Sequence, residues 1–161
     1  MAKHKYTTSM DGAKAVGRDL PISIKTSVEV CRFIRGRNVV VAKNMLRDVV
    51  ALKRAVPYRR YVLDIGHRKG MATGRFPKKT SKEILEVLES AETNAQFKGM
   101  NTSRLFVAHI AAHKASAPMR GGRKRGQSAK RAHVEIILQE REEKKDVPKM
   151  KKNETSSGER K

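Results

Sequence analysis

The sequence contains few of the residue types that form disulfides, zinc clusters or aromatic binding surfaces. Cys31 is the only cysteine in 161 residues, so an intramolecular disulfide is impossible and a zinc cluster is disfavoured. Its surroundings, SVEVCRFI, form an apolar pattern, which predicts a small buried side chain rather than a reactive thiol. Tryptophan is absent and aromatic residues make up 4% of the chain, which argues against a single-strand binder that stacks bases on aromatic side chains.

Long apolar segments are also missing. No stretch approaches the roughly 18 apolar residues that a membrane-spanning helix requires. The opening residues MAKHKYTTSM lack the apolar region of a secretory signal peptide. From these two absences we expect a soluble, non-secreted protein, with no membrane as its partner.

Acidic residues are scarce relative to basic ones. The chain has 16 Asp and Glu against 37 Lys and Arg, which gives a formal net charge of +21. Such a charge destabilises a small folded protein through self-repulsion unless a polyanion neutralises it. Nucleic acid is the polyanion that this excess favours, because basic side chains displace its condensed counterions. With so few aromatic residues, the excess predicts recognition of folded nucleic acid through phosphates, sugars and shape.

The basic excess belongs to the larger, N-terminal part of the chain. The last segment, Glu140 to Lys161, has eight basic and six acidic residues and little apolar surface, so we expect residues 141–161 to form a disordered charged tail. Residues 1–139 hold 29 basic and 10 acidic residues, a net charge of +19. We therefore predict that residues 1–140 form one basic globular domain.

Three stretches have the periodicity of amphipathic helices. The motifs TSVE at 26–29 and TSKE at 80–83 have the form of capping boxes and predict that helices begin there. Asn38 is expected to cap a further helix running from about Val39 to Arg54, whose apolar residues share one face.

Beyond residue 100 the period changes from helical to alternating. Leu105–Ala112 and His133–Glu140 each alternate and predict a β-hairpin over about 102–140, with a glycine-rich tip at 116–131. A further strand is expected in AKAVGRDLPIS. The predicted fold class is α+β, with three helices packed on a small antiparallel three-stranded sheet and a long protruding β-hairpin.

Two motifs resemble catalytic or metal-binding patterns without completing them. GGRKRGQS nearly fits the nucleotide-binding loop GxxxxGK[ST], but Gln127 replaces the lysine and Pro118 interrupts the approaching strand. His109 and His113 have the spacing of zinc-binding helices, yet Ile110 stands where such a motif needs glutamate. We therefore predict no enzymatic activity, no metal and no cofactor.

The basic segments are the candidate binding elements. From Lys53 to Lys82 there are ten basic residues and one acid, Asp64. This span is expected to contain a long loop, YVLDIGHRKGMATGRFPKK, which interleaves charges with glycine, so backbone and side chains can both approach phosphates. A solvated surface is the alternative interpretation of such charge runs. Arginines suited to bidentate phosphate contacts also flank the end of the first helix and fill the hairpin tip; they are Arg32, Arg35, Arg37, Arg120, Arg123, Arg125 and Arg131.

Three segments together resemble a known family. VPYRRYVLDIGHRKGMATGRFPKK, ESAETNAQFKGM and HVEIILQE, in this order and spacing, resemble universal large-subunit ribosomal protein twenty-two in its archaeal and eukaryotic form, also called protein seventeen. The resemblance covers about residues 12–140. It implies an α+β domain seated on large-subunit rRNA in cytoplasmic ribosomes. It further implies that neighbouring ribosomal proteins are partners, that no homo-oligomer forms, and that the hairpin reaches the wall of the nascent-polypeptide exit tunnel.

The resemblance also assigns residues to these roles. The residues implied to contact rRNA from the globular part are Arg59, Arg60, His67, Arg68, Lys69, Arg75, Lys78 and Lys79. The residues implied to form the hairpin tip near the nascent polypeptide are Met119, Arg120, Arg123, Lys124, Arg125, Gln127, Lys130 and Arg131. The tip sequence MRGGRKRGQSAKRAH differs from the PRAxGR-like element common in the family, so roles of single tip arginines are not transferred.

Two other function classes compete with a structural ribosomal role. A free-standing DNA- or RNA-binding module would also be basic, although no helix-turn-helix or zinc motif supports it. A nucleotide-dependent enzyme would require the incomplete GGRKRGQS loop to bind ATP or GTP. Comigration with large ribosomal subunits separates the first of these from the ribosomal hypothesis, and saturable nucleotide binding identifies the second.

Overall fold

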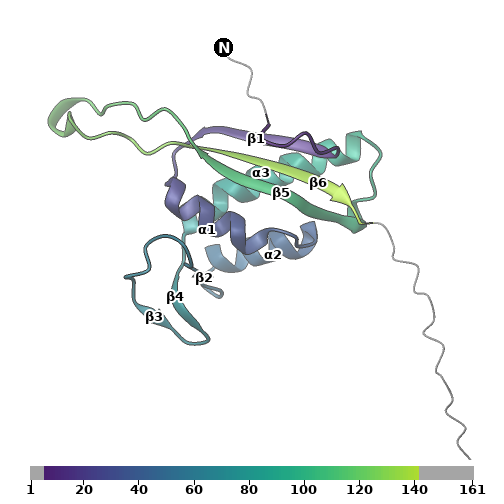
Figure 1. The fold of residues 1–161 in the computed structure, drawn as a ribbon, viewed down its shortest axis with the longest axis horizontal. Helices are drawn as coiled ribbons and strands as arrows, with labels where there is room; N and C mark the ends of the chain where they lie inside the picture. Colours follow the sequence, from purple (N-terminus) through teal and green to yellow (C-terminus); the bar gives the residue numbers. More distant parts are fainter. Residues whose placement is uncertain (1–5, 142–161) are drawn as a thin grey trace, which may run out of the picture.

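The centre of the fold is an antiparallel three-stranded sheet with the order β1-β6-β5 (Figure 1). The computed structural model describes residues 6–141, where β1 spans Ala13–Leu20, β5 spans Leu105–Lys114 and β6 spans Ala132–Glu140. The first and last strands of this region pair with each other, which places β6 in the middle of the sheet. Apart from Arg141, the predicted charged tail lies outside the described residues.

Within residues 6–141, three α-helices cover one face of this sheet: α1 (Ile24–Ile34), α2 (Val39–Val50) and α3 (Lys78–Phe97). α3 packs on β1 and β6, α1 packs on β5, and α2 packs against α3 (Figure 1). Fully buried aliphatic side chains from both layers include Leu46, Ile84, Leu88 and Ile136. Burying each such side chain contributes roughly 1.5–3 kcal/mol. The predicted α+β class is confirmed, and none of the helices in this region is long and apolar enough to cross a membrane.

A bulge interrupts the alternation of β5. Its register with β6 shifts between Val107 and His109. Leu105 and Val107 are buried in the core before the shift, and Ile110 is buried there after it. An unbroken alternation would place the side chains of Val107 and His109 on the same face of the sheet. Because of the extra residue, His109 lies beside Glu135 instead.

Neither predicted capping box marks a helix start, so both expectations were wrong. α1 begins at Ile24 and α3 begins at Lys78, in each case before the motifs at 26–29 and 80–83. Pro77 immediately precedes α3 with φ −77°, and a proline with this dihedral suits the entry to a helix. The threonine and serine residues of the two boxes therefore lie in the first turns, and the two glutamates lie in the second turns.

The start of α2 follows the prediction but its end does not. The side chain of Asn38 accepts a hydrogen bond from the backbone N–H of Val40 at 2.9 Å, as expected of a capping residue. The helix ends at Val50 rather than near Arg54. Leu52 adopts a left-handed conformation with φ 63°, which a continuing right-handed helix cannot contain.

A second, smaller antiparallel sheet lies in the described region, with the order β2-β4-β3. β2 spans Val56–Pro57, β3 spans His67–Arg68 and β4 spans Met71–Arg75 (Figure 1). The sequence predicted a long loop here, which was wrong because strands this short contain too few residues to show alternation. Gly70 has φ 77° in the turn between β3 and β4. This left-handed conformation favours glycine, so the turn requires glycine at this position.

Residues 115–131 connect β5 to β6 and extend well beyond the sheet (Figure 1). We call this segment the arm; it contains the predicted hairpin tip, 116–131. Its two sides remain paired, because the backbone N–H of Arg120 donates to the carbonyl oxygen of Gln127 at 2.9 Å. A short 3₁₀ turn, Gly122–Lys124, forms its end. The arm is thus a direct continuation of the two strands that form the core sheet.

Candidate nucleic-acid interface

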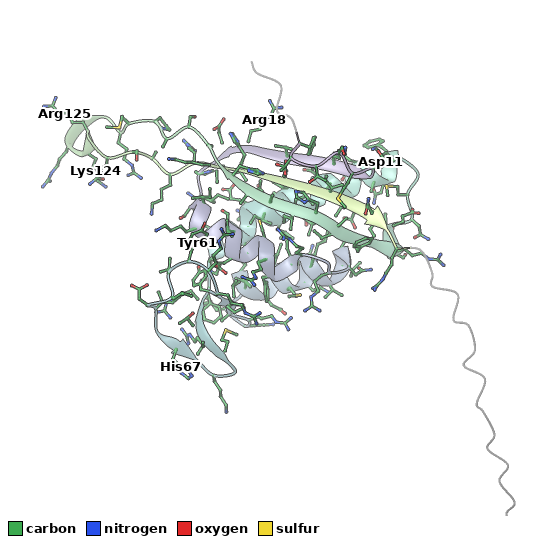
Figure 2. All side chains as sticks on the ribbon, viewed as in Figure 1. Asp11, Arg18, Tyr61, His67, Lys124 and Arg125 are labelled. Carbon is green, nitrogen blue, oxygen red and sulfur yellow. The ribbon has the colours of Figure 1, made fainter. Side chains whose placement is uncertain are left out.

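Two basic segments project from the helix–sheet body in different directions. One is the region of the second sheet, residues 56–75, which we call the small sheet, and the other is the arm. Figure 2 shows His67 at the end of the small sheet, and Lys124 and Arg125 at the end of the arm. Asp64 is the one acidic residue in residues 56–75, and residues 115–131 contain none. The fold therefore presents two cationic surfaces that are separated in space.

The small sheet exposes most of the cations predicted there. The side chains of Arg59, Arg60, Arg68 and Lys69 are exposed, as is that of His67. An exposed guanidinium or ammonium group can exchange its water shell for a phosphate without disturbing the protein core.

Two of these arginines lie over aromatic rings. The guanidinium of Arg60 is 5.4 Å from the centre of the Tyr61 ring, and that of Arg68 is 5.2 Å from the centre of the Phe76 ring. Such contacts restrict a long side chain while leaving its donors available. Two aromatic residues of this surface therefore hold arginines in place.

Arg75 and Arg35 each already bind backbone oxygens of the protein. Arg75 is half-buried and donates to the carbonyl oxygens of Gly66 at 3.1 Å and Gly74 at 3.0 Å. These bonds join the end of the connection between β2 and β3 to β4. Arg35 donates to the carbonyl oxygen of Ile110 at 2.8 Å, which joins the end of α1 to β5. Both side chains therefore contribute to the fold as well as to the surface charge.

A cleft of about 230 Å³ brings together cations from α1 and the small sheet. The predicted residues Arg32, Arg37 and Arg59 all line it. Its complete lining is Glu29, Arg32, Phe33, Arg37, Pro57 and Arg59. The arginines at the end of the first helix and those of the VPYRRY motif thus belong to one continuous surface.

A second cavity, of about 540 Å³, lies where the arm leaves the body. Lys79, Lys130 and Arg131 line it, so the start of α3 and the base of the arm face the same space. Lys78 is exposed beside Lys79, and the first turn of α3 contains no acid. Lysines at a helix N-terminus oppose the helix dipole, an arrangement that a bound anion relieves.

The arm itself is almost entirely exposed. Arg131 is half-buried at its base and donates to the carbonyl oxygen of Asp19 at 3.3 Å. The remaining predicted tip residues are exposed; they are Met119, Arg120, Arg123, Lys124, Arg125, Gln127 and Lys130. These exposed side chains are therefore accessible to another molecule.

Glu29 is a residue of this surface that the sequence did not reveal. Its side chain is buried, and its carboxylate accepts hydrogen bonds from the backbone N–H groups of Arg59, Arg60 and Tyr61 at 3.1, 2.9 and 2.8 Å. In the sequence it resembles the acid of a capping box. Nothing in the local pattern indicates a contact with a segment 30 residues further along the chain.

The histidine pair and the cysteine have structural surroundings. His109 and His113 each place Nε2 near one oxygen of Glu135, at 3.0 and 3.2 Å. Among residues 6–141, no group of three or more His, Cys, Asp or Glu side chains is placed to hold a metal ion. Cys31 is buried in the core, and burial raises the pKa of its thiol to about 12, as expected for an inert side chain.

The fold and the charge distribution define a class of protein: a small basic α+β domain with exposed cations on two projections. Comparison with known sequences identifies its family. Residues 15–139 match the model of the family described as Ribosomal protein L22p/L17e. Since this match covers most of the chain, the chain belongs to that family, whose members are structural proteins rather than enzymes.

Archaeal relatives match over most of their length. The chain is 42% identical over 149 residues to large ribosomal subunit protein uL22 of Methanococcoides burtonii, which covers 87% of this chain and 99% of that protein. It is 44% identical over 138 residues to the protein of the same name from Methanopyrus kandleri, covering 80% and 87%. The resemblance found in the sequence, including its archaeal type, is confirmed.

Proposed function

We propose that this chain, by its family a structural constituent of the large ribosomal subunit, binds large-subunit rRNA through the small sheet, the adjoining helix ends and the arm. The observation that carries the proposal is the concentration of exposed cations on two projections that together contain one acid, Asp64. Each phosphate that these side chains neutralise releases condensed counterions, which favours binding of a folded polyanion.

The proposed recognition depends on phosphate position and RNA shape. Arg59, Arg60, Arg68 and Lys69 are exposed on the small sheet, while Lys79 shares a cavity with the base of the arm. Cations distributed over two directions can contact RNA segments that are distant in the rRNA sequence. By holding such segments together, the domain formed by residues 1–140 would assist assembly of the subunit in cytoplasmic ribosomes.

The arm is proposed to pass between rRNA segments and to line the nascent-polypeptide exit tunnel with its end. Its length, its exposure and its arginines support this role, together with the family resemblance. In this arrangement the nascent polypeptide and neighbouring large-subunit proteins are its further partners, and the exposed Lys124 and Arg125 lie at the end of the arm.

Sedimentation of cell lysates on sucrose gradients tests the proposal. The tagged chain should comigrate with large subunits in stoichiometric amount and remain bound after a wash in moderate salt. On the same particles, a photoreactive group introduced in place of Arg125, at the end of the arm, should crosslink to a stalled nascent chain. A chain that sediments freely would contradict the ribosomal role, and a crosslink to rRNA alone would contradict the tunnel contact.

A further inference from the structure

Glu29 connects α1 to the basic loop of the small sheet through a buried carboxylate. Its side chain is 1% exposed. One oxygen, Oε1, accepts from the backbone N–H groups of Arg60 at 2.9 Å and Tyr61 at 2.8 Å, and the other accepts from that of Arg59 at 3.1 Å. Three consecutive amides of one loop therefore converge on a single carboxylate from another element.

This arrangement fixes the backbone of the loop. Successive N–H groups that point to one place form an anion-binding concavity, and here a carboxylate of the protein itself occupies it. Hydrogen bonds from amides to an ionised carboxylate are stronger than bonds between neutral groups. Because the amides face inward toward Glu29, the side chains of Arg59 and Arg60 remain exposed on the surface.

Hydrogen bonds between Tyr58 and Thr73 fix the residue directly before the same loop. The backbone N–H of Tyr58 donates to the carbonyl oxygen of Thr73 at 3.0 Å, and the Thr73 hydroxyl donates to the carbonyl oxygen of Tyr58 at 2.8 Å. Directly after the loop, Val62 has φ 58°, a left-handed conformation that β-branched residues rarely adopt. Such a conformation persists where the surrounding contacts determine the backbone.

We propose that Glu29 is a positioning residue for RNA binding: it acts through the backbone of residues 59–61 to place the Arg59 and Arg60 guanidinium groups for contact with phosphates. This inference rests on the proposed rRNA binding. It predicts an effect opposite in sign to simple electrostatics. Removing a negative charge beside a phosphate-binding surface should strengthen binding through Coulomb attraction, whereas removing the charge of Glu29 should weaken it.

The first test compares Glu29→Gln with Asp64→Asn in the full-length chain. Glutamine offers one acceptor oxygen and turns an NH₂ group toward the amide of Arg59, so the loop loses its fixed geometry. Asp64 is exposed on the same segment, and its substitution removes the same charge. With large-subunit rRNA of Methanococcoides burtonii as the probe, E29Q should bind about tenfold more weakly. The slope of log K against log salt concentration should fall by the equivalent of up to about two phosphate contacts. D64N should bind as tightly as the unaltered chain or more tightly.

A double-mutant cycle shows whether Glu29 acts through the arginines. Arg59→Ala with Arg60→Ala should weaken binding by itself, and adding E29Q in that background should have no further effect on affinity. Independent, additive losses would overturn the inference, as would an E29Q chain that binds like the unaltered one. Amide exchange supplies the structural readout: the amides of residues 59–61 should exchange faster in E29Q, while that of Ile136 stays protected.

Thr73→Val provides a second route if E29Q does not fold. It removes the hydroxyl that donates to Tyr58 but leaves Glu29 in place, so it should weaken rRNA binding in the same direction and lose its effect in the Arg59→Ala, Arg60→Ala background. An unaltered chain that fails to bind rRNA contradicts the proposed function itself. An unaltered chain that binds, with E29Q and Thr73→Val both equivalent to it, contradicts the positioning role alone.

Discussion

Glu135 is a buried carboxylate on the central strand β6, and its surroundings keep it ionised. The backbone N–H of Thr7 donates to Oε2 at 3.2 Å, while Nε2 of His109 and Nε2 of His113 lie 3.0 and 3.2 Å from Oε1. Burial by itself would raise the pKa of Glu135, but the hydrogen bonds from Thr7 and the two histidines outweigh it and lower the pKa from 4.5 to about 2. The N-terminal segment is thereby fastened to the sheet.

This pKa shift predicts how stability depends on pH. Since the folded-state pKa lies below the ordinary value, the ionised Glu135 contributes stability above pH 4.5, and that contribution is lost as pH falls toward 2. Glu135→Gln should therefore be less stable than the unaltered chain at neutral pH, with a smaller loss of stability between pH 4.5 and 2. Urea unfolding at several pH values measures both effects.

Glu86→Gln is the matched control, because Glu86 is exposed on α3. It should reproduce the pH dependence of the unaltered chain. If Glu135→Gln retains the full acid sensitivity, the hydrogen bonds to Glu135 are not the source of that sensitivity.

At the scale of elements, the close approach of α3 to β1 depends on Gly17. A Cβ atom added at Gly17 would lie 2.6 Å from Cγ2 of Val87 and 2.8 Å from Cδ1 of Leu20. Both distances are shorter than van der Waals contact, and Val87 belongs to the buried core. The helix can therefore lie directly on the strand because the strand carries no side chain there.

Gly17→Ala should consequently destabilise the fold by about 1–3 kcal/mol, the usual cost of an overpacked core. Gly121→Ala, in the arm, adds a methyl group with no heavy atom within 4 Å and should leave stability nearly unchanged. Denaturant midpoints with unchanged slopes measure the difference. Equal midpoints for the two variants would show that α3 can shift to accommodate the added methyl group.

The elements also show what the sequence could and could not predict. Asn38 and the α+β class followed from local patterns, because a cap and a hydrophobic period each leave a local signature. The β5 bulge and the small sheet did not, since neither produces a periodic signal. Glu29 was invisible for a related reason: its partners at 59–61 are chosen by how α1 meets the small sheet, which is a tertiary contact.

The whole molecule separates its charges. Acidic side chains of α3 pair with α2, through Lys43–Glu92 and through Arg47–Glu89 at 3.4 Å. The projections hold their cations with little compensation, and the formal net charge of the chain is +21. The free protein therefore contains a repulsion that a bound polyanion would remove.

Raising sodium chloride from about 0.05 to 0.5 M should therefore stabilise the RNA-free protein, because screening shortens the range of repulsion to a few ångströms. The urea midpoint should rise over this range. Sucrose at matched osmolality serves as the control for effects unrelated to charge. A midpoint that falls with salt would mean that attractive ion pairs, rather than repulsion, dominate the electrostatics of the fold.

The continuity of the arm with β5 and β6 has a mechanical consequence. A pull on the arm along the strand direction acts on β6, which is hydrogen-bonded on both sides, to β1 and to β5. The inter-strand bonds of an antiparallel sheet lie perpendicular to that pull, so they share the load instead of opening one after another. A segment that projects far from the body is thus anchored where hydrogen bonds on both sides of β6 share the tension.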